Sequence, residues 1–138
     1  MQQYMHLHRS RFNKRQHESR LTIRNLLKIG DIWGISKKQA MALLGTSSLQ
    51  QLGQWSDTAD GMLLTEDQVE TASFLVALHS CLEKMLQSPQ AIRQWLQTPL
   101  PEHSPAEGVT PLEFLLKHQS KLIAARTICQ WIESQANR

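Results

Sequence analysis

Apolar residues recur three or four positions apart along most of this chain, which is the spacing of amphipathic α-helices. A first helix is predicted from Ser19, and Gly30 is expected to end it. Its apolar positions are Ile23, Leu26, Leu27 and Ile29. A capping-box sequence beginning at Ser36 predicts a second helix, which Gly45 is expected to stop. Residues 1–17 are polar and lack a periodic apolar face, so we expect an arm there.

A third short helix is predicted from Ser47, where Gln50 completes another start signal. Its apolar positions are Leu49, Leu52 and Trp55. Together with the helix before it and the Gly-containing turn between them, this segment predicts a helix-turn-helix.

The second half of the chain carries stronger helix signals. Thr65 followed by two acids and Gln68 predicts a long helix that runs to about Leu86. The apolar positions expected to make it the central buried helix are Val69, Ala72, Leu75, Val76, Leu78, Leu82, Met85 and Leu86. Ser88-Pro89 and Thr110-Pro111 each predict a further helix start, and residues 122–132 predict a last helix.

No alternating strand pattern competes with these helices, so the predicted fold class is all-α, with six to seven helices. The expected order is a helix-turn-helix near the N-terminus followed by a small C-terminal helical module. The predicted organisation is a basic arm at 1–18, the helix-turn-helix region at 19–64, a linking helix at 65–88 and the C-terminal module at 89–138.

Charge divides the chain unevenly. Residues 1–40 hold nine Lys or Arg against two acids, giving +7, whereas residues 41–138 hold six basic and ten acidic residues, giving −4. This asymmetry favours a basic end that meets a polyanion, although a merely solvated charged terminus remains the simpler alternative.

The chain shows no sequence pattern of an enzyme or a metal site. CxxC, HExxH, GxSxG and glycine-rich phosphate loops are missing from the sequence, so we expect no catalysis and no cofactor. Cys81 and Cys129 lie far apart, and neither a secretory leader nor a membrane-spanning stretch is recognisable. We therefore expect a cytoplasmic protein without a membrane partner.

The helix-turn-helix predicts which residues contact DNA. Side chains at the start of the second helix would contact base edges, because that helix enters the major groove. They are Ser47, Ser48, Gln50, Gln51 and Gln54. The predicted phosphate contacts are Lys37 and Lys38, with Arg9, Arg11, Lys14 and Arg15 in the arm. The alternative is a helical hairpin that only packs. Because one short helix contacts few bases, we also expect a homodimer on paired half-sites.

The ordered set of motifs resembles the Xre/MbcA/ParS family of bacterial antitoxins, over roughly residues 25 to 135. In the first half the similar segments are WGIS at 33–36, AMALLG at 40–45 and the short helix that ends in Trp55. LTEDQV at 64–69 matches the link. The closer second half has WLQTP at 95–99, GVTPLEFL at 108–115 and IE at 132–133.

The resemblance implies a toxin-binding C-terminal module and a partner of the RES type, an NAD-degrading toxin. It also implies that the complex occupies the operator DNA upstream of both genes. On this basis the expected toxin-binding residues are Pro99, Pro111, Lys121, Arg126, Trp131, Glu133 and Arg138. Aromatic and aliphatic bulk suits an interface core, but Trp95 and Leu112 are expected to serve the module's own core instead.

Two alternatives remain open from the sequence. One is a helix-turn-helix transcription regulator without a toxin. The other is a protein-binding module that has lost DNA recognition, since residues 47–55 carry no Lys or Arg and Gln54 stands where family members commonly have a basic residue.

Overall fold

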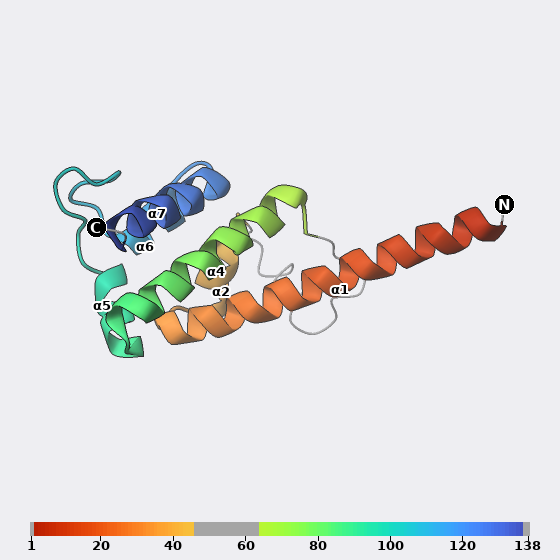
Figure 1. The fold of residues 1–138 in the computed structure, drawn as a ribbon, viewed down its shortest axis with the longest axis horizontal. Coiled ribbons are helices and arrows are strands. Elements are labelled where there is room, and N and C mark those ends of the chain that lie inside the picture. Colours follow the sequence, from red (N-terminus) through yellow and green to blue (C-terminus); the bar gives the residue numbers. More distant parts are fainter. Residues whose placement is uncertain (1, 46–63, 137–138) are drawn as a thin grey trace.

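The computed structural model describes residues 2–45 and 64–136, and before His17 it describes the backbone and the Lys14 side chain. These residues form six helices and no β-strand beyond an isolated bridge between Leu100 and Glu107. Figure 1 shows how the helices are arranged. The helices are α1 (Gln2–Trp33), α2 (Lys37–Ala42), α4 (Glu66–Leu86), α5 (Pro89–Leu96), α6 (Pro111–Lys117) and α7 (Lys121–Ala136). The all-α prediction is confirmed. The predicted recognition helix, residues 47–55, lies outside the described residues.

The first helix is much longer than the sequence pattern predicts. It begins at Gln2 rather than at Ser19, so the expected basic arm is helical over its described backbone. It also continues past Gly30, and the prediction that Gly30 ends it is wrong. A glycine suits this position for a different reason: a Cβ atom there would lie 3.0 Å from Cβ of Ala40, a tight contact where α2 packs against α1.

Gly34 ends α1 instead. It has a positive φ of 76°. Its N–H donates to the Asp31 carbonyl at 3.1 Å, and the Ile35 N–H donates to the Gly30 carbonyl at 3.0 Å. These two bonds form a Schellman motif. Arg93 of α5 adds a third contact, because its Nε donates to the Ile32 carbonyl at 2.7 Å. A guanidinium at a helix C-terminus also opposes the negative end of the dipole, so α5 is tied to the end of α1.

Four of the predicted helix starts are confirmed by their caps. Ser36 and Thr65 each form a complete capping box, with Gln39 and Gln68 as the reciprocal partners. Ser88 and Thr110 accept backbone N–H bonds at the starts of α5 and α6, each followed by a proline at the first helical position.

α4 is the central helix, but its buried face differs from the predicted one. Val69, Val76 and Met85 are exposed, by 38%, 39% and 42% respectively. Thr71 and His79 are buried in their place, beside the predicted Ala72, Leu75, Leu78 and Leu82. The polar side chains are accommodated because each is hydrogen-bonded: Thr71 Oγ1 donates to the Asp67 carbonyl, and His79 has two partners.

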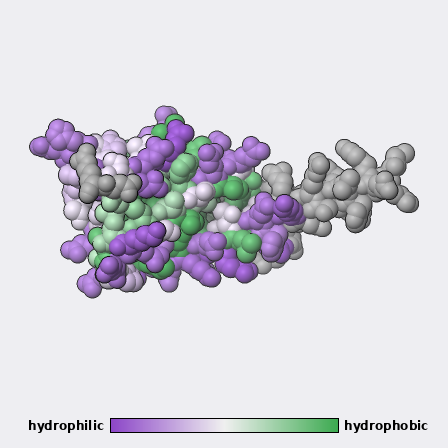
Figure 2. Space-filling view, viewed as in Figure 1, coloured by the Kyte–Doolittle hydropathy of each residue, from purple (hydrophilic) through white to green (hydrophobic). Residues whose placement is uncertain are grey.

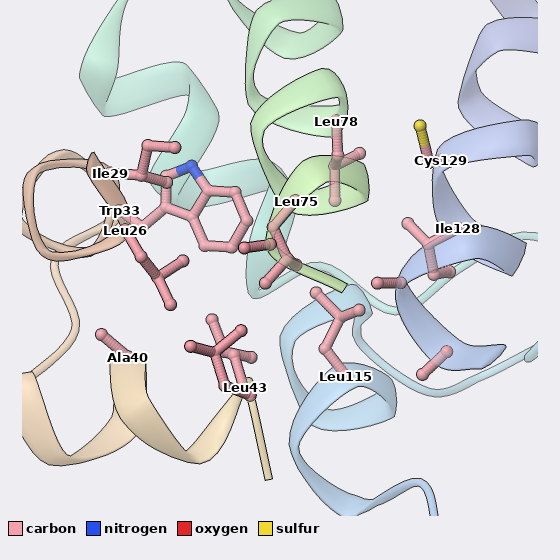
Figure 3. Close-up of a cluster of buried hydrophobic side chains, with 14 of the residues drawn as sticks. Leu26, Ile29, Trp33, Ala40, Leu43, Leu75, Leu78, Leu115, Ile128 and Cys129 are labelled. Carbon is pink, nitrogen blue, oxygen red and sulfur yellow. The ribbon is translucent and has the colours of Figure 1, made fainter. Parts of the chain in front are cut away.

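The buried side chains of all six helices form one hydrophobic cluster. In Figure 1, α4 lies between α1 and α7, and its contacts with α7 are the most extensive. Figure 3 shows how the cluster bridges these layers. Leu26 and Trp33 approach from α1, Leu75 from α4, and Leu115 and Ile128 from the C-terminal helices. The N-terminal and C-terminal halves are therefore held together through α4.

Candidate DNA-binding and partner-binding surfaces

The predicted phosphate-binding residues are only partly described. Lys37 and Lys38 are exposed in the first turn of α2. The helix dipole disfavours cations at this end, so helix stability does not account for them. Lys14 is exposed on α1. Arg9, Arg11 and Arg15 lie on the helical backbone of α1. Ser47, Ser48, Gln50, Gln51 and Gln54 lie outside the described residues.

The long α1 creates a basic surface that the sequence pattern did not predict. Five exposed residues repeat along this helix at intervals of three or four, namely Lys14, His17, Arg20, Arg24 and Lys28. At 3.6 residues per turn they share the face opposite buried Ile23 and Leu26. We call this set the basic face of α1. From Lys14 to Lys28 it spans about 21 Å at 1.5 Å per residue.

The acidic residues near this face are few. Glu18 is the one carboxylate between residues 14 and 30, and its register places it at the edge of the basic face. Asp31 follows at the far end of the helix. A linear array of cations attracts an extended polyanion such as the DNA backbone. The spacing of three or four residues between these basic positions is visible in the sequence. It places them on one face only if a single helix covers residues 14–28.

The predicted toxin-binding residues are dispersed in the structure. Pro99, Arg126 and Glu133 are exposed, and Trp131 is half-buried against the core. Pro111 is buried at the start of α6, so it serves the fold. Arg138 lies outside the described residues.

Lys121 has an internal role. Its Nζ donates to the carbonyls of Leu115, Leu116 and His118, which are the last carbonyls of α6. Three acceptors match the three protons of an ammonium. Burial lowers the pKa of Lys121 below its usual 10.5. This residue therefore caps α6 and joins it to α7.

The outer face of α7 is the best candidate for a protein partner. Ile123, Arg126, Gln130 and Glu133 are exposed together on the side opposite the core residues Ala125 and Ile128, and Ile123 is 45% exposed. The predicted toxin-binding residues include Arg126 and Glu133 but not Ile123, because an apolar residue within a helix gives no sign in the sequence that it is exposed. On this face Ile123 is the exposed aliphatic side chain, and Arg126 and Glu133 add charges of opposite sign.

Glu133 also contacts the buried thiol of Cys129, whose Sγ donates to Glu133 Oε1 at 3.4 Å. Burial first, then this bond and the negative charge of Glu133, raise the pKa of Cys129 to about 12. A thiol with such a pKa stays protonated at neutral pH and is a poor nucleophile.

One small cleft adjoins a buried histidine. Its lining residues are Ile32, His79, Glu83, Gln87, Ser88, Pro89 and Ile92. His79 Nδ1 accepts a bond from Trp33 Nε1, and its Nε2 lies 2.7 Å from Glu83 Oε1. Both ring nitrogens are therefore engaged within the fold. In the described part of the chain, no three His, Cys, Asp or Glu residues are grouped to hold a metal ion.

Hydrophilic side chains cover much of the surface in Figure 2, with apolar patches among them. Within the described residues, no helix combines the length and apolar character needed to cross a bilayer. Comparison of the chain with protein-family models, curated proteins and solved structures finds no match.

Proposed function

We propose that this protein is an antitoxin that binds operator DNA through its N-terminal half and a RES-type, NAD-degrading toxin through its C-terminal half. The basic face of α1 carries the proposal, because its lysine and arginine side chains offer a row of positive charges to phosphate. The ordered motifs from residue 33 to residue 133 support the choice of an antitoxin over other DNA-binding proteins.

The proposed DNA contact divides into two kinds. Arg24, Lys28 and Lys37 neutralise phosphates and release counterions, which provides affinity for any sequence. Gln50 and Gln51 contact base edges in the major groove, where glutamine can bond adenine at two points. The first contact type positions the protein, and the second selects the operator.

The proposed toxin contact uses the outer face of α7, with Ile123 and Arg126 at its centre. The exposed segment around Pro99, just after the end of α5, is a separate candidate for the same partner. Covering the cofactor cleft of the toxin would prevent NAD from entering. Pro111 and Lys121 contribute indirectly, because they fix α6 against α7.

Co-expression with the product of the neighbouring gene tests this function. We expect that product to arrest growth and lower cellular NAD when expressed alone, and this protein to restore both. Ile123→Asp combined with Arg126→Glu should abolish the rescue, whereas the matched pair Lys84→Glu with Val76→Asp on exposed positions of α4 should not. A neighbouring product that is harmless alone, or that stays toxic beside this protein, contradicts the proposal.

A stand-alone helix-turn-helix transcription regulator is the second candidate. It is favoured by the internal roles of Pro111 and Lys121, which remove two predicted toxin contacts from the surface. This candidate predicts operator binding without any stable complex with the neighbouring product.

A further inference from the structure

The N-terminal half of α1 extends away from the rest of the molecule, as Figure 1 shows. Burial of the described α1 side chains begins at Ser19 and continues to Trp33. Residues 2–17 therefore form a helix of about 24 Å, at 1.5 Å per residue, beyond the point where α1 joins the core. A helix of this length is marginal in water without a packing partner.

The helical register of α1 continues its core-facing side into the projecting half. Met5, Phe12, Ser19, Leu26 and Trp33 recur at intervals of seven. Positions seven apart lie close to one face of a helix, as in paired helices with a heptad repeat. Leu26 and Trp33 are in the core and Ser19 is buried at its edge. Met5 and Phe12 thus occupy the same face where α1 has no partner within the described chain.

A groove lies where the projecting half begins. It is lined by Glu18, Ser19, Leu64, Glu66, Val69, Glu70 and Ser73, from α1 and the start of α4. Ser19 Oγ accepts the Leu64 N–H at 3.1 Å and so joins the two walls. Val69 is 38% exposed, and three of the seven lining residues are glutamates. The lining therefore combines an exposed aliphatic side chain with acidic ones.

The projecting half has the opposite charge. Residues 2–17 contain four Lys or Arg and no Asp or Glu, giving +4, whereas the lining of the groove contains three Glu, giving −3. An apolar stripe within a basic helix suits an acidic groove with an exposed valine.

We propose that the projecting half of α1 in one copy occupies this groove in a second copy, and that two chains pair by their antiparallel α1 helices. A two-fold axis near residues 15 and 16 places Phe12 of each copy opposite Ser19 of the partner subunit. Each groove is then filled once, as the symmetry of a closed dimer requires. The basic face of α1 points away from this contact, so the dimer does not depend on the proposed function.

Charge exchange between two variants tests the proposal. Sedimentation equilibrium should give wild-type dimers. Arg11→Glu with Arg15→Glu and, separately, Glu66→Arg with Glu70→Arg should each weaken self-association at least about tenfold, since like charges then meet. Mixing the two variants in equal amounts should restore dimers, because each helix then meets a groove of opposite charge. The matched control is Glu102→Arg with Glu107→Arg, in the exposed loop between α5 and α6.

Circular dichroism of the same samples provides a second readout. Dilution below the dimer dissociation constant should reduce helicity, because the projecting half then has no helix to pack against. A monomeric wild type would assign the groove to another occupant, such as residues 46–63 of the same chain, and overturn the proposal. It is equally overturned if the charge-reversed variants dimerise like the wild type, or if their mixture stays monomeric.

Discussion

The indole Nε1 of Trp33 donates a hydrogen bond of 2.9 Å to Nδ1 of His79, joining the end of α1 to the middle of α4. Trp33 is 1% exposed and His79 is 5% exposed. Because an indole N–H can only donate, Nδ1 must carry the lone pair, and the ring proton resides on Nε2 facing Glu83. The bond therefore determines the tautomer of a buried histidine.

Replacing Trp33 tests how much this hydrogen bond contributes to the free energy of unfolding. Trp33→Phe should lower the free energy of unfolding by about 1–3 kcal/mol, because Nδ1 of His79 is left buried without a donor. Urea unfolding followed by circular dichroism measures the change. The matched control is Trp131→Phe at a half-buried position, which should cost less. Equal losses in the two variants would contradict this role for the bond.

The raised pKa of Cys129 predicts a loss of stability at alkaline pH. The fold favours the protonated thiol, so its contribution is complete below the usual pKa of 9.0 and is lost as pH rises towards about 12. The urea concentration at the unfolding midpoint should fall between neutral pH and the middle of this pH window. The fall should be larger in the wild type than in Cys129→Ala. Cys81→Ala, on the neighbouring helix, should keep most of the wild-type pH dependence, because Cys81 is the last and smallest of the causes that raise the pKa of Cys129. Identical pH dependence in all three proteins would refute the prediction.

Gln87 at the end of α4 offers a stabilising substitution. Its φ of 61° places a residue with a side chain in the left-handed region. Gln87→Gly should raise the free energy of unfolding by about 1 kcal/mol, because glycine adopts this conformation without the Cβ penalty. The control is Gln90→Gly at an exposed position of α5. It should lower the free energy of unfolding, because glycine within a helix is unfavourable. Thermal unfolding distinguishes the two; a lower midpoint for Gln87→Gly would count against the conformational argument.

Gln50 and Gln51 are predicted to select the operator sequence. Gln50→Ala or Gln51→Ala should lower the ratio of operator affinity to non-specific affinity, with little effect on the salt dependence of binding. Competition assays against randomised DNA give this ratio. If the ratio is unchanged, the recognition helix lies elsewhere in the chain.

Local signals explain why much of the fold was predictable. Ser36, Thr65, Ser88 and Thr110 begin helices through bonds that span three residues, so neighbouring sequence is sufficient to predict them. The contacts that the prediction missed are long-range. Gly30 lies within α1 rather than at its end, and its close approach to Ala40, ten positions later, accounts for a residue without a side chain there.

The part of the buried face of α4 that the sequence did not predict has the same explanation. His79 is buried because Trp33, 46 positions earlier, bonds to it. Val76, three positions before His79 and next to it on the helix surface, falls just outside the buried stripe and is 39% exposed. Hydropathy alone would bury Val76 and expose His79. Their actual environments are therefore set by tertiary contacts rather than by the local sequence.

The candidate sites, like the fold, were predictable from local sequence only in part. Net charge predicted a basic N-terminal region, but not the basic face, because Arg24 and Lys28 align with Lys14 only when α1 is continuous. On the partner side, Lys121 was selected for its charge, yet its ammonium caps α6. Composition identifies the type of surface, and packing decides which residues form it.

Equilibrium binding to the promoter fragment preceding this gene, measured over a series of salt concentrations, tests operator binding by the basic face of α1 most directly. Arg24→Ala with Lys28→Ala should reduce the magnitude of the slope of log affinity against log salt by about 2, one for each phosphate that the variant no longer neutralises. Lys84→Ala with Arg126→Ala removes the same charge from other helices and should leave the slope unchanged. Equal slopes for the wild type and both variants, or no binding of the wild type at low salt, would contradict the proposed role of α1.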